Sequence, residues 1–110
     1  MQAIGKIGDR YLELKENSLV RYVFLRLLRR EFDICIRQED LERAELAKLC
    51  IVVYDSPEEF YESTGWARDN PDSCDFSYLL ENRICRIIDG KVWYFSRLRY
   101  EEGVKRLQSN

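Results

Sequence analysis

The hydrophobic positions of residues 18–32 repeat with the period of an α-helix. With side chains about 100° apart, the apolar residues on one side of this helix are Leu19, Val20, Val23, Phe24, Leu27 and Leu28. A stripe of this kind is typical of a helix that packs on a core. Asn17 or Ser18 can cap its start, while Arg29 and Arg30 suit its last turn, where the helix dipole favours cations. We expect this helix to be the centre of the fold.

The opposite side of the same helix combines cations with apolar groups and has no acid: it carries Arg21, Tyr22, Leu25, Arg26 and Arg29. In one interpretation another element covers Tyr22 and Leu25, and the arginines reach past it to water. In the other, this face contacts nucleic acid or an acidic partner. A membrane span is excluded, because the apolar run is too short and arginines interrupt it.

Two stretches predict β-structure strongly. Residues 50–54 form a continuous run of mostly β-branched and aromatic side chains, which favours a buried central strand. Residues 84–88 and 91–96 are apolar runs joined by Asp89-Gly90, the pair preferred where both turn residues need positive φ. We therefore expect a C-terminal β-hairpin.

Weaker patterns predict the elements between these landmarks. Ile34 and Ile36 alternate with other residues and indicate a short strand at 33–37. Residues 2–15 fit a hairpin of strands 2–7 and 10–15, or alternatively residues 9–16 form an extra helical turn before the main helix. Residues 65–75 form a long loop, in which Trp66 either fills the core or makes an exposed contact.

Four further segments are predicted to be helical: residues 39–49, 57–64, 76–82 and 98–108. Ser56 as the cap and Pro57 at the first helical position make the second of these starts specific. In the last, Leu98, Val104 and Leu107 would face the core, and Gly103 would weaken the helix.

The length of 110 residues, with 45% hydrophobic and 13% aromatic residues, is that of one folded domain. Taken together, the patterns predict an α+β fold for residues 1–110. A small antiparallel or mixed sheet, which includes the C-terminal hairpin, packs on the central amphipathic helix.

The cysteine and histidine counts limit the chemistry. The four cysteines have no paired spacing, so we expect free, mostly buried thiols in a reducing cytoplasm, and the N-terminal residues lack the apolar core of a secretory signal. Without histidine, Ser-His-Asp and Cys-His nucleophile systems are excluded. Asp40, Glu45 and Lys48 only faintly resemble a nuclease set. We expect no enzyme activity, catalytic residue, cofactor or metal ion.

Charge is strongly segregated along the chain. Residues 1–30 have a net charge of +4, residues 31–82 of −10 and residues 83–110 of +4. Arginine dominates the cations, and its planar group suits contact with phosphate or carboxylate as well as surface ion pairs.

Two classes of function are favoured, and an enzyme ranks third. We expect a small regulatory or binding protein of the adaptor or inhibitor type, acting on a protein partner or on a second copy in a homodimer. The alternative is a nucleic-acid-binding protein that uses its arginine-rich ends, since the order helix, strand, helix, helix, hairpin resembles a winged-helix plan. The strand at 50–54 and an acidic helix at 56–64 depart from that plan. The candidate binding residues are Arg21, Arg26, Arg29, Arg86, Lys91, Trp93, Arg97, Arg99 and Trp66.

Overall fold

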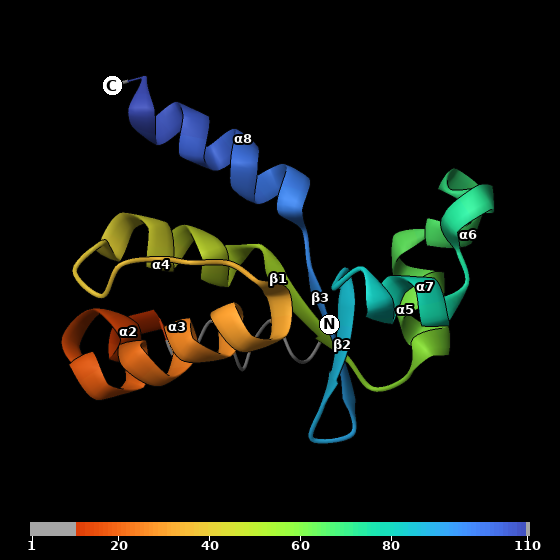
Figure 1. The fold of residues 1–110 in the computed structure, drawn as a ribbon, viewed down its shortest axis with the longest axis horizontal. Helices are drawn as coiled ribbons and strands as arrows, with labels where there is room; N and C mark the ends of the chain where they lie inside the picture. The colour runs from red at the N-terminus through yellow and green to blue at the C-terminus, as the bar shows by residue number, and fades with distance from the viewer. Residues whose placement is uncertain (1–10, 110) are drawn as a thin grey trace.

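The structure is a computed structural model that describes residues 11–109, which contain seven α-helices and a three-stranded antiparallel sheet (Figure 1). The helices are α2 (Tyr11–Glu16), α3 (Ser18–Phe32), α4 (Leu41–Leu49), α5 (Pro57–Thr64), α6 (Trp66–Asp69), α7 (Phe76–Glu81) and α8 (Arg97–Gln108). The strands are β1 (Ile51–Tyr54), β2 (Cys85–Ile88) and β3 (Lys91–Phe95), and a 3-10 turn spans Pro71–Ser73. The predicted α+β class is confirmed.

The sheet has the order β1-β3-β2, so β3 is its central strand. Asp89 and Gly90 both have positive φ, and the predicted hairpin is confirmed. The prediction that residues 50–54 form the central strand is wrong, because β3 is central and β1 lies at an edge of the sheet that residues 11–109 form. Both faces of this sheet are covered, so an edge strand here is as continuously apolar as a central one.

The sheet lies between two groups of helices (Figure 1), and a separate hydrophobic core fills each side of it. On one face, Ile51, Val53 and Phe95 pack with side chains from α3, α4 and α8. On the other, Val92 and Cys85 pack with α5 and α7. Alternate residues of β3 therefore contribute to each core, as the two-residue period of a strand requires.

Helix α3 is rotated relative to the orientation that its sequence predicts. Its buried residues are Leu25, Leu28 and Phe32, whereas Leu19 is 68% exposed and Val23 is 57% exposed. The helix is apolar over most of its circumference, so two different stripes could face the core. The stripe of Leu25, Leu28 and Phe32 faces the core, and Leu19 and Val23 are turned to the outside.

Other local predictions have mixed outcomes. The segment 11–16 is helical, so the alternative of a helical turn is confirmed and the strand at 10–15 is wrong, while residues 2–7 lie outside the described residues. Residues 33–37 form no strand, although Ile34 and Ile36 do turn partly inward. Within 65–75, α6 and a 3-10 turn replace much of the expected loop.

The helices at α4, α5, α7 and α8 lie where they were predicted. Ser56 caps α5 by accepting a hydrogen bond from the Glu59 N–H at 3.1 Å, with Pro57 at the start of the helix. In α8 the buried residues are Tyr100 and Gly103, and the inward position predicted for Leu98 is wrong. No helix within residues 11–109 is long and apolar enough to span a bilayer.

Candidate functional site

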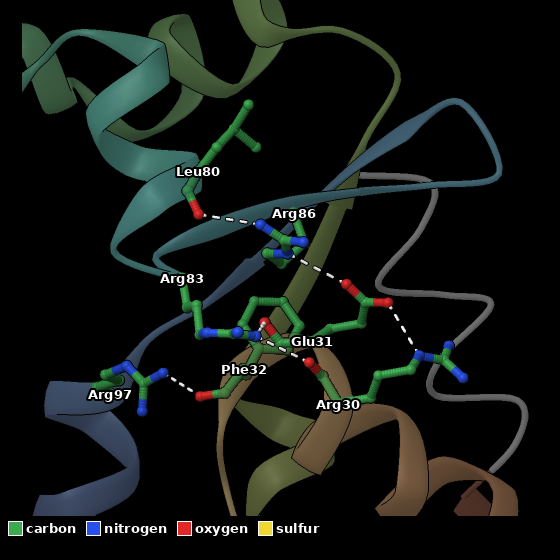
Figure 2. Close-up of polar contacts among 7 residues, drawn as sticks. All are labelled: Arg30, Glu31, Phe32, Leu80, Arg83, Arg86 and Arg97. Atoms are coloured by element: carbon green, nitrogen blue, oxygen red, sulfur yellow. Dashed lines mark hydrogen bonds and ion pairs between the residues drawn. The ribbon is translucent and has the colours of Figure 1, made fainter.

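Arginines from later parts of the chain converge on the C-terminal end of α3 (Figure 2). The last carbonyl groups of a helix have no partner within it. Arg83 Nη1 donates to the Arg30 carbonyl at 2.8 Å and to the Glu31 carbonyl at 3.2 Å, and Arg97 donates to the Phe32 carbonyl. These arginines therefore satisfy the open end of the helix and tie it to the hairpin and to α8.

Arg86 joins three elements at the same place. Its Nε atom donates to Glu31 Oε1 at 3.1 Å, and its Nη1 atom donates to the Leu80 carbonyl at 3.0 Å (Figure 2). Partial burial alone would raise the pKa of Glu31, but hydrogen bonds from Arg30 and Arg86 outweigh it and hold that pKa below its usual value. The guanidinium of Arg86 thus stabilises the contact between α3, α7 and β2.

Three more of the predicted binding residues have partners inside the protein. Arg21 donates to the Gln38 carbonyl at 2.8 Å and to the Leu14 carbonyl at 2.7 Å. Lys91 forms an ion pair with Asp55 at 2.6 Å, which raises the pKa of the lysine. The indole of Trp66 packs in the core that contains Phe60, and its Nε1 atom donates to the Ser73 carbonyl at 2.9 Å.

The remaining predicted residues do not form one site. Trp93 is partly buried against the core beside α3. Arg26, Arg29 and Arg99 are exposed and have no ion pair among residues 11–109, but Arg99 lies on α8, whereas the other two lie on α3. Among residues 11–109 the structure therefore leaves Arg26 and Arg29 of α3 and Arg99 of α8 without an ion pair, and it engages the other predicted cations.

The outward side of α3 is the most unusual exposed surface among the described residues. We call it the α3 outer face, and it consists of Leu19, Tyr22, Val23, Arg26, Arg29 and Arg30. Tyr22 is 50% exposed, so three large apolar or aromatic side chains meet solvent on two adjacent turns. The face has no acid of its own, and among residues 11–109 its one ion pair joins Arg30 to Glu31 at 3.0 Å.

Sequence reasoning found the arginines and Tyr22 of this face but placed Leu19 and Val23 in the core. No local sequence signal could have corrected that placement, because each of the two possible stripes contains a phenylalanine: Phe24 in the predicted stripe and Phe32 in the stripe that faces the core.

A strongly acidic region lies across the sheet from α3. Residues 55–82 carry eight acids and one base, and α5, α6 and α7 of this region cover the opposite side of the sheet (Figure 1). Most of these carboxylates are exposed, among them Glu58, Glu62, Asp75 and Glu81. This side of the sheet is therefore predominantly acidic, whereas the side with α3, α4 and α8 carries both acids and bases.

The polar groups of the described residues offer little for catalysis. In residues 11–109 no three cysteine or carboxylate side chains are placed to hold a metal ion. Asp40 is used as the cap of α4, where it accepts from the Arg43 N–H. Burial raises the pKa of the Cys85 thiol to about 12, so it stays protonated at neutral pH.

A hollow of about 430 Å³ lies beside α8. Its lining mixes Asp33 and Glu101 with Arg43 and Lys105, so it favours neither anions nor cations. It is a weaker candidate than the α3 outer face, whose charge has one sign.

Comparison of the chain with protein-family models, with curated proteins and with solved structures found no match. The chemistry of the α3 outer face is that of recognition. Apolar side chains on adjacent turns can be buried against a partner, and the arginines beside them can pair with carboxylates or phosphates.

Proposed function

We propose that this protein is a small non-enzymatic binding protein, of the adaptor or inhibitor type, that docks on another protein through the α3 outer face. One observation carries the proposal: Leu19, Tyr22 and Val23 are each at least half exposed on adjacent turns of a helix whose other side is fully packed. Contiguous apolar surface of this kind on a folded protein commonly marks an interaction site.

The apolar half of the face favours a protein partner over nucleic acid. Leu19 and Val23 have no polar atoms with which to contact a phosphate, and they gain most when another apolar surface covers them, at about 25 cal/mol per Å². Arg86, Arg97 and Lys91, on which the nucleic-acid alternative relies, donate to groups of the protein itself. Fewer cations therefore remain to contact phosphates.

The test compares two double variants of matched exposure. Leu19→Ser with Val23→Ser alters the α3 outer face, while Leu49→Ser with Leu98→Ser removes two exposed apolar side chains elsewhere, since Leu49 is 61% and Leu98 is 68% exposed. Each protein is immobilised, and proteins from a lysate are captured with and without nuclease treatment. We expect the first variant alone to lose the captured proteins, with no effect of nuclease.

Two results would contradict the proposal. Equal capture by both variants would show that the α3 outer face is not the docking surface. Loss of capture after nuclease treatment would assign the binding to nucleic acid, held by arginines through phosphate contacts. Thermal unfolding of each variant serves as the control for folding, because exposed substitutions shift stability by about 0.5 kcal/mol or less.

A further inference from the structure

We infer that the α3 outer face binds the acidic side of α7 of a second copy of this chain, in a head-to-tail contact. This inference rests on the proposed function and names the partner of the same surface. It is carried by two surfaces of one molecule that complement each other in charge and in apolar character.

The first surface is asymmetric along α3. Its N-terminal half presents the apolar group Leu19, Tyr22 and Val23, and its C-terminal half presents Arg26 and Arg29. The first turn of α3 contains no acid, and its cap is the neutral side chain of Asn17, which accepts hydrogen bonds from the Leu19 and Val20 N–H groups. The positive end of the helix dipole at this turn favours an anion. A matching partner would bring an anion, an apolar group and another anion in that order.

The second surface has this order. Asp75, Tyr78 and Glu81 are three residues apart along α7, so they lie on one side of it, about 4.5 Å apart along the axis. Tyr78 is 43% exposed, and both carboxylates are exposed with no ion pair among residues 11–109. An exposed tyrosine between two unpaired acids is suited to cover an apolar group that is flanked by positive charge.

The two surfaces match when the helices run in the same direction. Asp75 then lies near the start of α3, Tyr78 covers Leu19 and Val23, and Glu81 reaches Arg26. With a rise of about 1.5 Å per residue, the two acids are about 9 Å apart along α7. The first turn of α3, at Leu19, and Arg26 are about 10 Å apart along α3. The spacing of charged and apolar groups therefore agrees between the two helices.

The contact joins two different surfaces, so it is heterologous. Such a contact gives a ring, or an open chain with one unused surface at each end, rather than a closed two-fold dimer. A small interface with exposed charges is weak, and we expect association to depend on protein concentration and on salt.

The experiment measures mass in solution by sedimentation velocity from about 10 µM to about 1 mM, a range that covers weak affinities. We expect the mean mass to rise with concentration at about 0.05 M salt and to fall back at about 0.5 M salt, where screening is stronger. A monomer at every concentration and both salt levels would overturn the inference.

Charge reversal tests which surfaces meet. We expect Arg26→Glu and Glu81→Arg each to weaken self-association by at least about tenfold, because like charges then face each other across the contact. An equimolar mixture of the two variants should associate again, since each meets opposite charge on the other. The matched controls are Arg106→Glu and Glu102→Arg on α8, which should associate like the unaltered protein.

The outcomes separate this inference from the proposed function. If neither reversal weakens self-association, or if the mixture does not restore it, the contact involves other surfaces and the inference is overturned. A strictly monomeric protein whose capture of other proteins still requires Leu19 and Val23 would refute the second copy as partner and leave the proposed function standing.

Discussion

Gly103 lies where α8 packs closely on α4. A Cβ atom at this position would come within 2.6 Å of Leu46 Cδ1, and the glycine is buried. A glycine in the middle of a helix costs about 1 kcal/mol relative to alanine. Here the missing side chain makes room for Leu46, so the residue that weakens α8 as an isolated helix also allows it to pack closely.

We therefore predict that Gly103→Ala depends on residue 46. In a Leu46→Ala background, where the facing side chain is short, the alanine should stabilise the protein by about 1 kcal/mol through helix propensity. With Leu46 present, that gain should be reduced or reversed. Urea unfolding of the unaltered protein, the two single variants and the double variant measures the coupling energy between residues 46 and 103. An equal effect of Gly103→Ala in both backgrounds would show that this contact does not contribute to stability.

Among the helices, the C-terminal end of α3 depends most on residues far away in sequence. Arg83, Arg86 and Arg97 supply donors to its last turn from the hairpin region and from α8. We expect Arg86→Met to reduce stability at neutral pH by about 1–3 kcal/mol, because it leaves the Glu31 carboxylate and the Leu80 carbonyl without this donor. Arg37→Met, which removes an exposed pair with Glu39, is the matched control and should cost about 0–1 kcal/mol.

The effect of Arg86→Met on the pH dependence of stability follows from the carboxyl group of Glu31. The folded protein holds the pKa of this carboxyl below its usual value of 4.5, so the resulting stability is present above that value and is lost as pH falls through the folded-state pKa. Removing Arg86 brings the folded pKa closer to the unfolded one, and the loss of stability in acid should become smaller. Free energies of unfolding at about pH 7 and about pH 3 measure this, and an unchanged pH dependence would show that Arg86 does not stabilise the charged carboxylate.

The elements that could be predicted from the sequence are those whose cause is local. Asp89-Gly90 defines the hairpin and Ser56-Pro57 defines the start of α5, because the turn and the cap depend only on adjacent residues. The rotation of α3 could not be predicted, since Leu19 and Leu25 are equally apolar and only the packing of the other elements selects between them. The central position of β3 depends likewise on its pairing with β1 across about 40 residues, as in Ile51 with Phe95.

The candidate site was predictable only in part, for the same reason. Charge and residue type identify the arginines, but the partners of Arg21, Arg83 and Arg97 are backbone carbonyls, which every residue has and no sequence pattern marks. The α3 outer face became visible only when the core had selected the other side of the helix.

At the scale of the whole molecule, each side of the sheet contains one tryptophan. Trp66 packs in the core with Phe60, and Trp93 packs against the core with Phe32. Because Val92 and Phe95 of β3 are buried in different cores, we expect the two sides to unfold together. The variants Trp66→Phe and Trp93→Phe each keep one tryptophan, which reports on one side of the sheet. In each variant, the fluorescence transition in urea should coincide with the circular dichroism transition. Separate transitions within either variant would show that the sides are independent.

Strand β3 is central in space but comes after β1 and β2 in the chain, and this order affects how the protein is made. During synthesis β1 leaves the ribosome about 40 residues before the strand with which it pairs, since Ile51 is bonded to the strand at Phe95. A growing chain must therefore keep its apolar β1 unpaired until β3 has been made. We expect the sheet of the newborn protein to form in one step after β3 emerges, and the chain to need shielding from aggregation before that point.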